Sequence, residues 1–139
     1  MTSGIVETFN GMPVHYIDAQ DALEAAAAGW LRREVVALDT EFMRVRTFHA
    51  QAALFQVCDG ETCFLVDPLA VGDLAPLARL LDARDVLKVM HSCSEDLEVC
   101  DRHLGTLPDP LVDTQIVAAF CGYPLSVGYQ KMLAAEFDV

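Results

Sequence analysis

An apolar run that ends in acidic residues does most to constrain the fold of this chain. The segment Val35-Val36-Ala37-Leu38 is typical of a strand buried on both faces, and Asp39-Thr40-Glu41 follows it directly. Because side chains alternate along a strand, Asp39 and Glu41 are expected to point to the same side. Two neighbouring carboxylates repel each other, and such a pair is usually neutralised by a cation or has a raised pKa. The sequence therefore predicts a strand that presents an acidic pair at its end.

A third carboxylate follows in the segment His91-Ser92-Cys93-Ser94-Glu95-Asp96, near the start of a predicted helix. Asp96 from this helix and the strand pair Asp39 and Glu41 together form a candidate oxygen-ligand site for Mg²⁺ or Mn²⁺. Each acid also has an ordinary explanation. By spacing alone, the strand pair is more typical of a solvent-exposed strand end than of a metal site. Asp96 by itself is more typical of a first helical turn after a Ser92-x-x-Glu95 capping box than of a ligand.

Length and charge bound the class of protein. The 139 residues correspond to one domain over 1–139, and 53% of them are apolar, which is enough for a hydrophobic core. No apolar run reaches the roughly 18 residues of a membrane helix, and the start shows no secretory signal, so a cytoplasmic protein without a membrane partner is expected. The net charge of −12 argues against nucleic-acid binding through bulk charge, although not against binding through metal ions.

The five cysteines are odd in number and include no C-x-x-C pair. This spacing disfavours a zinc ribbon or a disulfide framework and favours reduced, mostly buried thiols.

The order of predicted elements indicates an α/β fold. Strands are expected over 14–17, 35–39, 52–58, 61–66, 86–90 and 111–112, and helices over 22–28, 74–81, 94–103, 113–120 and 126–136. Asp59-Gly60 is a strong hairpin signal between the third and fourth strands. Strands that alternate with helices after such a hairpin predict a mixed sheet with helices on both faces.

Several polar residues near the acidic pair are candidates for supporting roles. His91 ends a predicted strand and is expected to be a hydrogen-bonded structural histidine more than a catalytic group. Asp113 is a candidate helix cap or loop anchor. Arg44, beyond Glu41, has the chemistry to meet a phosphate backbone, and Gln56 must find a hydrogen-bond partner within an apolar strand.

Read in order, these segments resemble bacterial ribonuclease D of the DEDD superfamily of 3′→5′ exonucleases. The matching segments run from about Val14 onward and are Leu38-Asp39-Thr40-Glu41-Phe42, Gln56-Val57, Asp67-Pro68-Leu69, His91-Ser92-x-x-Glu95-Asp96-Leu97-Glu98-Val99 and Val112-Asp113-Thr114-Gln115-Ile116-x-Ala118-Ala119-Phe120-Cys121-Gly122. The resemblance implies a ribonuclease H-like fold and two-metal hydrolysis of RNA 3′ ends, such as those of tRNA precursors. It assigns catalysis and metal binding to Asp39, Glu41 and Asp96. It suggests substrate contacts for Thr40, Phe42, Arg44, Gln56 and His91.

This chain differs from the family pattern at the third motif, which is a tyrosine followed four positions later by a fourth carboxylate. Neither Tyr123 nor Tyr129 has an acid at that spacing, so we expect a C-terminally incomplete domain that is inactive or weak alone. An apolar sheet face would then be exposed and would favour self-association. Two alternatives remain: a DNA-directed exonuclease of the same superfamily, and a degenerate, non-catalytic binding module.

Overall fold

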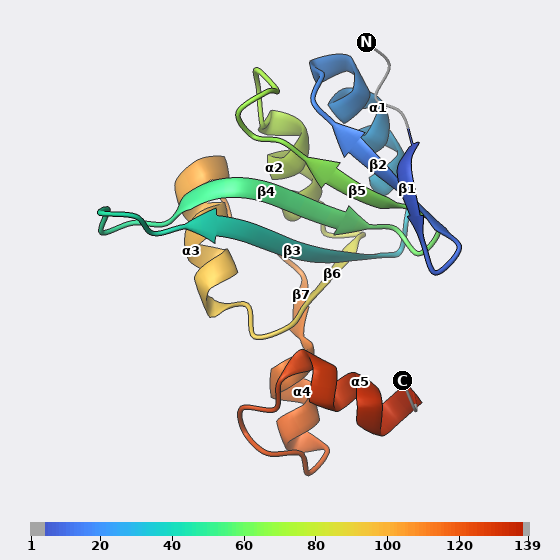
Figure 1. Ribbon diagram of the computed structural model, residues 1–139, viewed down its shortest axis with the longest axis vertical. Helices are drawn as coiled ribbons and strands as arrows, with labels where there is room; N and C mark the ends of the chain where they lie inside the picture. The colour runs from blue at the N-terminus through green and yellow to red at the C-terminus, as the bar shows by residue number, and fades with distance from the viewer. Residues whose placement is uncertain (1–4, 138–139) are drawn as a thin grey trace.

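The computed structural model describes residues 5–137 as a mixed seven-stranded sheet with five helices (Figure 1). The strands are β1 (Ile5–Phe9), β2 (Met12–Ile17), β3 (Val35–Met43), β4 (Gln51–Cys58), β5 (Cys63–Val66), β6 (Leu87–Met90) and β7 (Leu111–Asp113). The helices are α1 (Gln20–Trp30), α2 (Ala75–Asp82), α3 (Ser94–Leu104), α4 (Thr114–Phe120) and α5 (Tyr129–Phe137).

The strand order is β1-β2-β5-β4-β3-β6-β7. The pairs β2–β5, β3–β6 and β6–β7 are parallel, and the other neighbours are antiparallel. This arrangement confirms the predicted mixed α/β sheet. It places β3, which carries the acidic pair, between β4 and β6.

Two short turns set the register of the antiparallel strands. In the β4–β5 turn, Asp59 Oδ1 accepts hydrogen bonds from the backbone N–H groups of Glu61 and Thr62, and Gly60 adopts a φ of +89°. The hairpin predicted from Asp59-Gly60 is therefore confirmed. The β1–β2 turn uses Asn10 and Gly11, with φ values of +50° and +83°, as a hairpin turn with two left-handed residues requires. Sequence reasoning missed β1, although this Asn-Gly pair was a usable signal.

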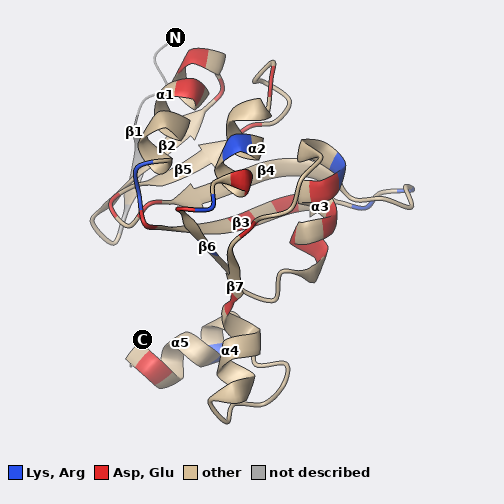
Figure 2. Cartoon of the chain, turned by 180° about the vertical axis from the view of Figure 1, so that it is seen from behind, with Lys and Arg blue, Asp and Glu red and all other residues tan. Residues whose placement is uncertain are grey.

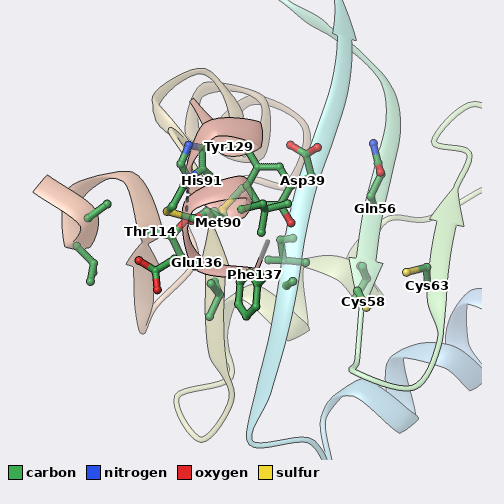
Figure 3. Close-up of a pocket in the computed structure, with 18 of the residues that line it drawn as sticks. Asp39, Gln56, Cys58, Cys63, Met90, His91, Thr114, Tyr129, Glu136 and Phe137 are labelled. Atoms are coloured by element: carbon green, nitrogen blue, oxygen red, sulfur yellow. Dashed lines mark hydrogen bonds between the residues drawn. The ribbon is translucent and has the colours of Figure 1, made fainter. Parts of the chain in front are cut away.

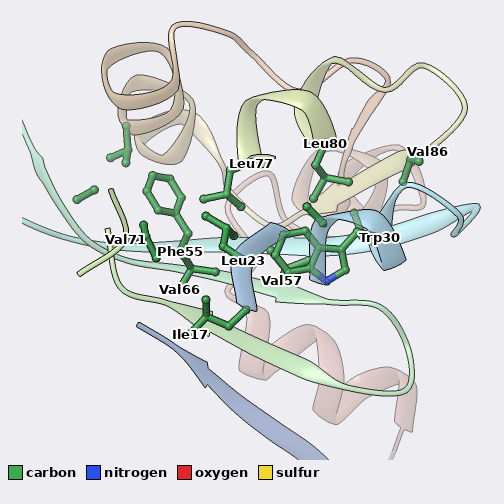
Figure 4. Packing of buried hydrophobic residues seen from close by; sticks show 14 of the residues in the cluster. Ile17, Leu23, Trp30, Phe55, Val57, Val66, Val71, Leu77, Leu80 and Val86 are labelled. Atoms are coloured by element: carbon green, nitrogen blue, oxygen red, sulfur yellow. The ribbon is translucent and has the colours of Figure 1, made fainter. Parts of the chain in front are cut away.

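The hydrophobic core lies between the sheet and three helices, α1, α2 and α3 (Figure 4). Helix α1 contributes Leu23, Ala27 and Trp30, whose spacing puts them on one side of the helix, and all three are buried. Alternate strand residues point to this covered face of the sheet and complete the core: Ile17, Val36, Phe55, Val57 and Val66.

The opposite face of the sheet is largely uncovered, and we call it the open face. On β3, Val36 is 1% exposed on the covered face, whereas its neighbour Val35 is 48% exposed on the open face. The prediction that this strand is buried on both faces is wrong, because α4 and α5 border the open face without packing closely on it. Helix α5, expected from 126, begins at Tyr129 and contains no buried residue.

All five cysteines are free thiols. Cys93 and Cys100 are buried, Cys58 and Cys63 are half-buried, and Cys121 is exposed, so the prediction of mostly buried thiols holds only in part. Within residues 5–137, no helix combines the length and apolar character needed to cross a membrane.

Candidate active site

Asp39 and Glu41 project from β3 on its open face. Thr40, between them, points to the covered face and is 7% exposed, so the side chains alternate as expected. The predicted common orientation of Asp39 and Glu41 is confirmed. We call residues 114–137, from the start of α4 to the end of α5, the α4–α5 segment. Figure 3 shows the Asp39 carboxylate beside β3, facing the space between the sheet and the α4–α5 segment.

Asp96 comes to this strand from the first turn of α3. β6 pairs with β3 only over Val35–Ala37, which leaves the following residues of β3 free on that edge. The start of α3 occupies the edge, and Asp96 Oδ1 accepts hydrogen bonds from the Thr40 backbone N–H at 3.1 Å and from Thr40 Oγ1 at 2.5 Å. Asp96 is only 7% exposed, so these bonds compensate for the burial of its charge.

The three carboxylates influence one another electrostatically. The pKa of Asp39 is raised, first by partial desolvation and then by the negative charge of Asp96, with a smaller contribution from Glu41. A hydrogen bond from the Thr40 backbone acts in the opposite direction. Figure 2 shows acidic residues along α3 and the neighbouring part of β3. The region is therefore one in which a bound cation lowers the electrostatic cost.

The carboxylates converge without forming a closed ligand set. In the part of the chain that the structure describes, no group of three or more His, Cys, Asp or Glu side chains is placed to hold a metal ion. Both hydrogen bonds from Thr40 fall on the same oxygen of Asp96, its Oδ1. Metal binding by Asp39, Glu41 and Asp96 accordingly stays a prediction.

Gln56 lies on β4 directly opposite Asp39 in the register of the two strands. Its Nε2 donates a hydrogen bond to Glu41 Oε1 at 3.4 Å. The partner expected for this amide is thus a carboxylate of the acidic pair.

Arg44 does not stand free to meet a phosphate. Its guanidinium group lies 2.9 Å from Glu98 and 3.4 Å from Glu95, both on α3, and 6.0 Å from the ring centre of Phe42. This pairing with Arg44 holds the pKa of Glu98 below its usual value. Phe42 itself packs against the core on the covered face. Substrate contacts by Arg44 and Phe42 remain predictions, and a contact by Arg44 requires exchange of these ion pairs.

His91 connects the end of β6 to the α4–α5 segment. Its Nδ1 lies 2.8 Å from Thr114 Oγ1 and its Nε2 lies 3.1 Å from the Val127 carbonyl oxygen. Gln115 Nε2 donates to the same carbonyl at 3.0 Å. His91 thus makes the hydrogen bonds expected of a structural histidine, and sequence reasoning missed the partner roles of Thr114 and Gln115.

Asp113 holds the loop between β6 and α3. Its carboxylate accepts hydrogen bonds from the backbone N–H groups of Ser92, Cys93 and Gln115, so it acts both as a cap for α4 and as a loop anchor, as expected. The capping box predicted for Ser92 and Glu95 is wrong. The N-cap residue that precedes α3 is Cys93, whose side chain makes no capping hydrogen bond, and Ser92 adopts a φ of +54°.

An open cleft of about 830 Å³ lies beside Asp39, between the open face of the sheet and the α4–α5 segment. The sheet contributes Ala37, Gln56 and Leu65, and the helical segment contributes Val117 and Leu133. Apart from Asp39 at one end and a few polar groups, the walls are apolar. This cleft is the space in which a ligand can lie against the acidic strand.

Comparison with known proteins identifies the family. Residues 14–139 match the family model described as a 3'-5' exonuclease. Ribonuclease D of Pseudomonas paraeruginosa is 46% identical over 126 residues, which cover 91% of this chain and 34% of the relative. Ribonuclease D of Escherichia coli K12 is 44% identical over 122 residues, which cover 88% of this chain and 32% of the relative. The chain therefore spans about a third of the length of these curated relatives.

Solved structures agree with the sequence comparison. The crystal structure of Escherichia coli RNase D, described as an exoribonuclease involved in structured RNA processing, matches with a TM-score of 0.89 and 43% identity over 92% of this chain and 34% of that chain. The Trypanosoma brucei RNase D complex with RNA U12 shares the fold, with a TM-score of 0.81 at 21% identity over 91% of this chain and 47% of that chain. Over the matched region, this chain therefore has the fold of RNase D, which agrees with the expected ribonuclease H-like fold. On the strength of the family match across residues 14–139, the chain belongs to the 3'-5' exonuclease family.

Proposed function

We propose that this chain forms part of a metal-dependent 3′→5′ exoribonuclease that hydrolyses phosphodiester bonds at RNA 3′ ends. The observation that carries the proposal is the meeting of β3 and α3, where Asp96 accepts two hydrogen bonds from Thr40, the residue between Asp39 and Glu41. The relatives named ribonuclease D support the reaction class.

The donor set fits a hard divalent cation. Asp39, Glu41 and Asp96 offer carboxylate oxygens, the ligands that Mg²⁺ and Mn²⁺ prefer over thiolates or imidazoles. A pair of such ions, when bound, supplies charge stabilisation and an activated water for phosphodiester hydrolysis.

The chain's own residues prepare this set of carboxylates. Thr40 fixes one oxygen of Asp96 through two hydrogen bonds, which restricts rotation of the carboxylate. Gln56 restrains Glu41 from the neighbouring strand. Positioning of this kind reduces the entropy lost when ligands and substrate are brought together.

The substrate we propose is the 3′ end of a structured RNA, such as a tRNA precursor. The net charge of −12 is unfavourable for long-range attraction of RNA, so binding depends on local contacts and on the bound cations. Arg44 becomes available for such a contact when a phosphate competes with Glu98 and Glu95.

Turnover by residues 1–139 alone is proposed to be weak. Within them, none of the tyrosines Tyr16, Tyr123 and Tyr129 is followed four positions later by an acidic residue. The motif that the resemblance assigns to the fourth carboxylate is therefore not supplied by these residues. Turnover equal to that of Escherichia coli ribonuclease D would contradict this part of the proposal.

A trimming assay tests the function. RNA labelled at its 5′ end, matched DNA, and RNA with a blocked 3′ end are incubated with the protein and Mn²⁺ or EDTA. We expect slow, Mn²⁺-dependent shortening of the unblocked RNA in single-nucleotide steps, lost in Asp39→Asn and unchanged in Asp101→Asn, an exposed acid on α3. Equal cleavage of blocked RNA, or trimming that survives Asp39→Asn, would overturn the proposal, and preference for DNA would favour the DNA-directed alternative.

A chimera provides the second arm of the test. Residues 14–137 replace the matching segment of Escherichia coli ribonuclease D, whose structure superposes on this chain with a TM-score of 0.89. A folded chimera that trims RNA, and loses this activity with Asp39→Asn, supports the exonuclease. A folded chimera that binds RNA without trimming it supports the non-catalytic module.

Self-association is the second proposed interaction. The open cleft and its surroundings expose Val117, Phe120 and Phe137, which are 47%, 90% and 68% exposed. Apolar surface of this kind favours association with a second copy. Light scattering should show a concentration-dependent increase in mass, and a monomer at all concentrations would contradict it.

A further inference from the structure

Three sulfur atoms meet on the open face at the end of the β4–β5 hairpin. The thiol of Cys63 lies 3.3 Å from the Met12 thioether sulfur, and the thiol of Cys58 lies 3.6 Å from the same atom. Cys58 and Cys63 are directly opposite each other in the register of β4 and β5, and Figure 3 shows them side by side. Cys58 and Cys63 line the same open cleft as Asp39, but the hydrolysis proposed for Asp39, Glu41 and Asp96 uses neither thiol.

The sheet register explains why the three side chains share one face. Cys58 and Cys63 are the last pair before the Asp59–Thr62 turn, so their side chains point the same way. On the other side of β5, Val14 of β2 is paired with Cys63, and Met12 lies two residues before Val14, which returns its side chain to that same face.

The chemistry of this cluster selects a soft metal ion. Two thiolates and a thioether are ligands for Cu(I), whereas Mg²⁺, Ca²⁺ and Mn²⁺ take oxygen ligands. Metal–sulfur bonds of about 2.3 Å place three sulfurs around one ion at about 4 Å from one another. The observed separations of 3.3 and 3.6 Å reach this spacing through small side-chain rotations.

We propose that Met12, Cys58 and Cys63 form a binding site for one Cu(I) ion, distinct from the carboxylates of the exonuclease site. All three side chains are half-buried, so an ion can reach them from solvent. Binding displaces the two thiol protons and changes no oxidation state, because Cu(I) enters and leaves as Cu(I). Asp59, next to Cys58, lies beside the site, and its charge is paired with Arg33 at 2.9 Å.

The protonation of the thiols makes binding depend on pH. Burial and the neighbouring Cys58 thiol raise the pKa of Cys63 to about 11. At neutral pH the metal therefore competes with a proton at Cys63, and the affinity for Cu(I) should increase as the pH rises.

Anaerobic titration of the reduced protein with Cu(I), delivered from its bicinchoninate complex, tests the site. We expect one bound equivalent to be lost in Cys58→Ser and in Cys63→Ser, and kept in Cys121→Ser, which alters an exposed cysteine elsewhere. Met12→Leu should lower the affinity by about tenfold, as loss of a supporting ligand contact does. Circular dichroism of each variant confirms that it is folded.

Alkylation gives a readout that is independent of the variants. In the wild-type protein, Cu(I) should protect Cys58 and Cys63 from iodoacetamide while Cys121 continues to react. Unchanged stoichiometry in both serine variants, or equal labelling of Cys58 and Cys63 with and without Cu(I), would overturn the proposal.

Discussion

Adjacent residues of β3 have opposite surroundings. Val36 lies under α1, α2 and α3 and is 1% exposed, whereas Val35 is 48% exposed on the other face of the same sheet. The covered face contains the large buried side chains, and the open face contains Asp39, the Gln56–Glu41 contact and the apolar cleft. One face therefore supplies the stability of the sheet, and the other presents its chemistry.

Removing the largest core side chain should have the greatest effect. Trp30 is 0% exposed and packs edge-on against Phe64, so Trp30→Ala is expected to lower the free energy of unfolding by about 3–5 kcal/mol. Phe120→Ala on α4, where the side chain is 90% exposed, should change it by less than about 0.5 kcal/mol. Urea denaturation followed by circular dichroism measures both values, and similar losses in the two variants would show that the covered face does not carry the stability.

Loss of the hydrogen bonds between Thr40 on β3 and Asp96 on α3 should have the second-largest effect on the free energy of unfolding. Asp96→Ala leaves the buried Thr40 N–H and hydroxyl without their acceptor, and the expected loss is about 1–3 kcal/mol. Asp96→Asn keeps a carbonyl oxygen in that position and should lose less. Asp101→Ala on the exposed side of α3 is the matched control, and a loss as large as that of Asp96→Ala would show that the Thr40 contact is unimportant.

Asp113→Asn should lower the free energy of unfolding by about 1 kcal/mol at neutral pH, the usual contribution of a helix cap. The size of this loss should depend on pH. Burial by itself raises the pKa of this carboxyl, but hydrogen bonds from Cys93, Ser92 and Gln115 outweigh it and hold the pKa below its ordinary value. The ionised form is therefore the stabilising one. Its contribution is present above the unfolded pKa and is lost as the pH falls through the folded pKa.

Denaturant titrations between pH 6 and pH 2 should therefore show a steeper acid loss for wild type than for Asp113→Asn. Parallel profiles for the two proteins would mean that the anchor does not titrate as described.

The smallest change in protein stability is expected for a substitution on the open face. Asp39→Asn removes a carboxylate whose pKa is raised by desolvation and by Asp96, and without metal it should stabilise the protein by at most about 1 kcal/mol at neutral pH. Because the pKa of Asp39 is raised in the folded state, the wild-type protein loses stability as the pH rises through that value. The asparagine variant has no such loss. Thermal unfolding in EDTA measures the difference, and a clear destabilisation would show that Asp39 has a structural role.

Local rules predicted much of this molecule correctly. The common orientation of Asp39 and Glu41 follows from the two-residue period of a strand, and the β4–β5 turn follows from Asp59-Gly60. Both depend on residues that are close together in the sequence, so no knowledge of tertiary packing is needed. The prediction of the mixed α/β sheet succeeded for the same reason.

The failures concern contacts made across the sequence. The start of α3 is held by Asp113, about twenty residues away, in place of the predicted Ser92 box. The exposure of Val35 depends on where α4 and α5 lie, which the apolar run could not reveal. The ion pairs that occupy Arg44 likewise come from a separate helix.

Mn²⁺ binding measured by electron paramagnetic resonance tests the central claim most directly, because it does not depend on turnover. The carboxylates of β3 and α3 should bind Mn²⁺ in the wild-type protein and in Asp101→Asn. Asp39→Asn and Asp96→Asn should each weaken binding by about tenfold or more while the fold is retained. Binding that is absent from the wild-type protein, or that is equal in all four proteins, would contradict the assignment of this site.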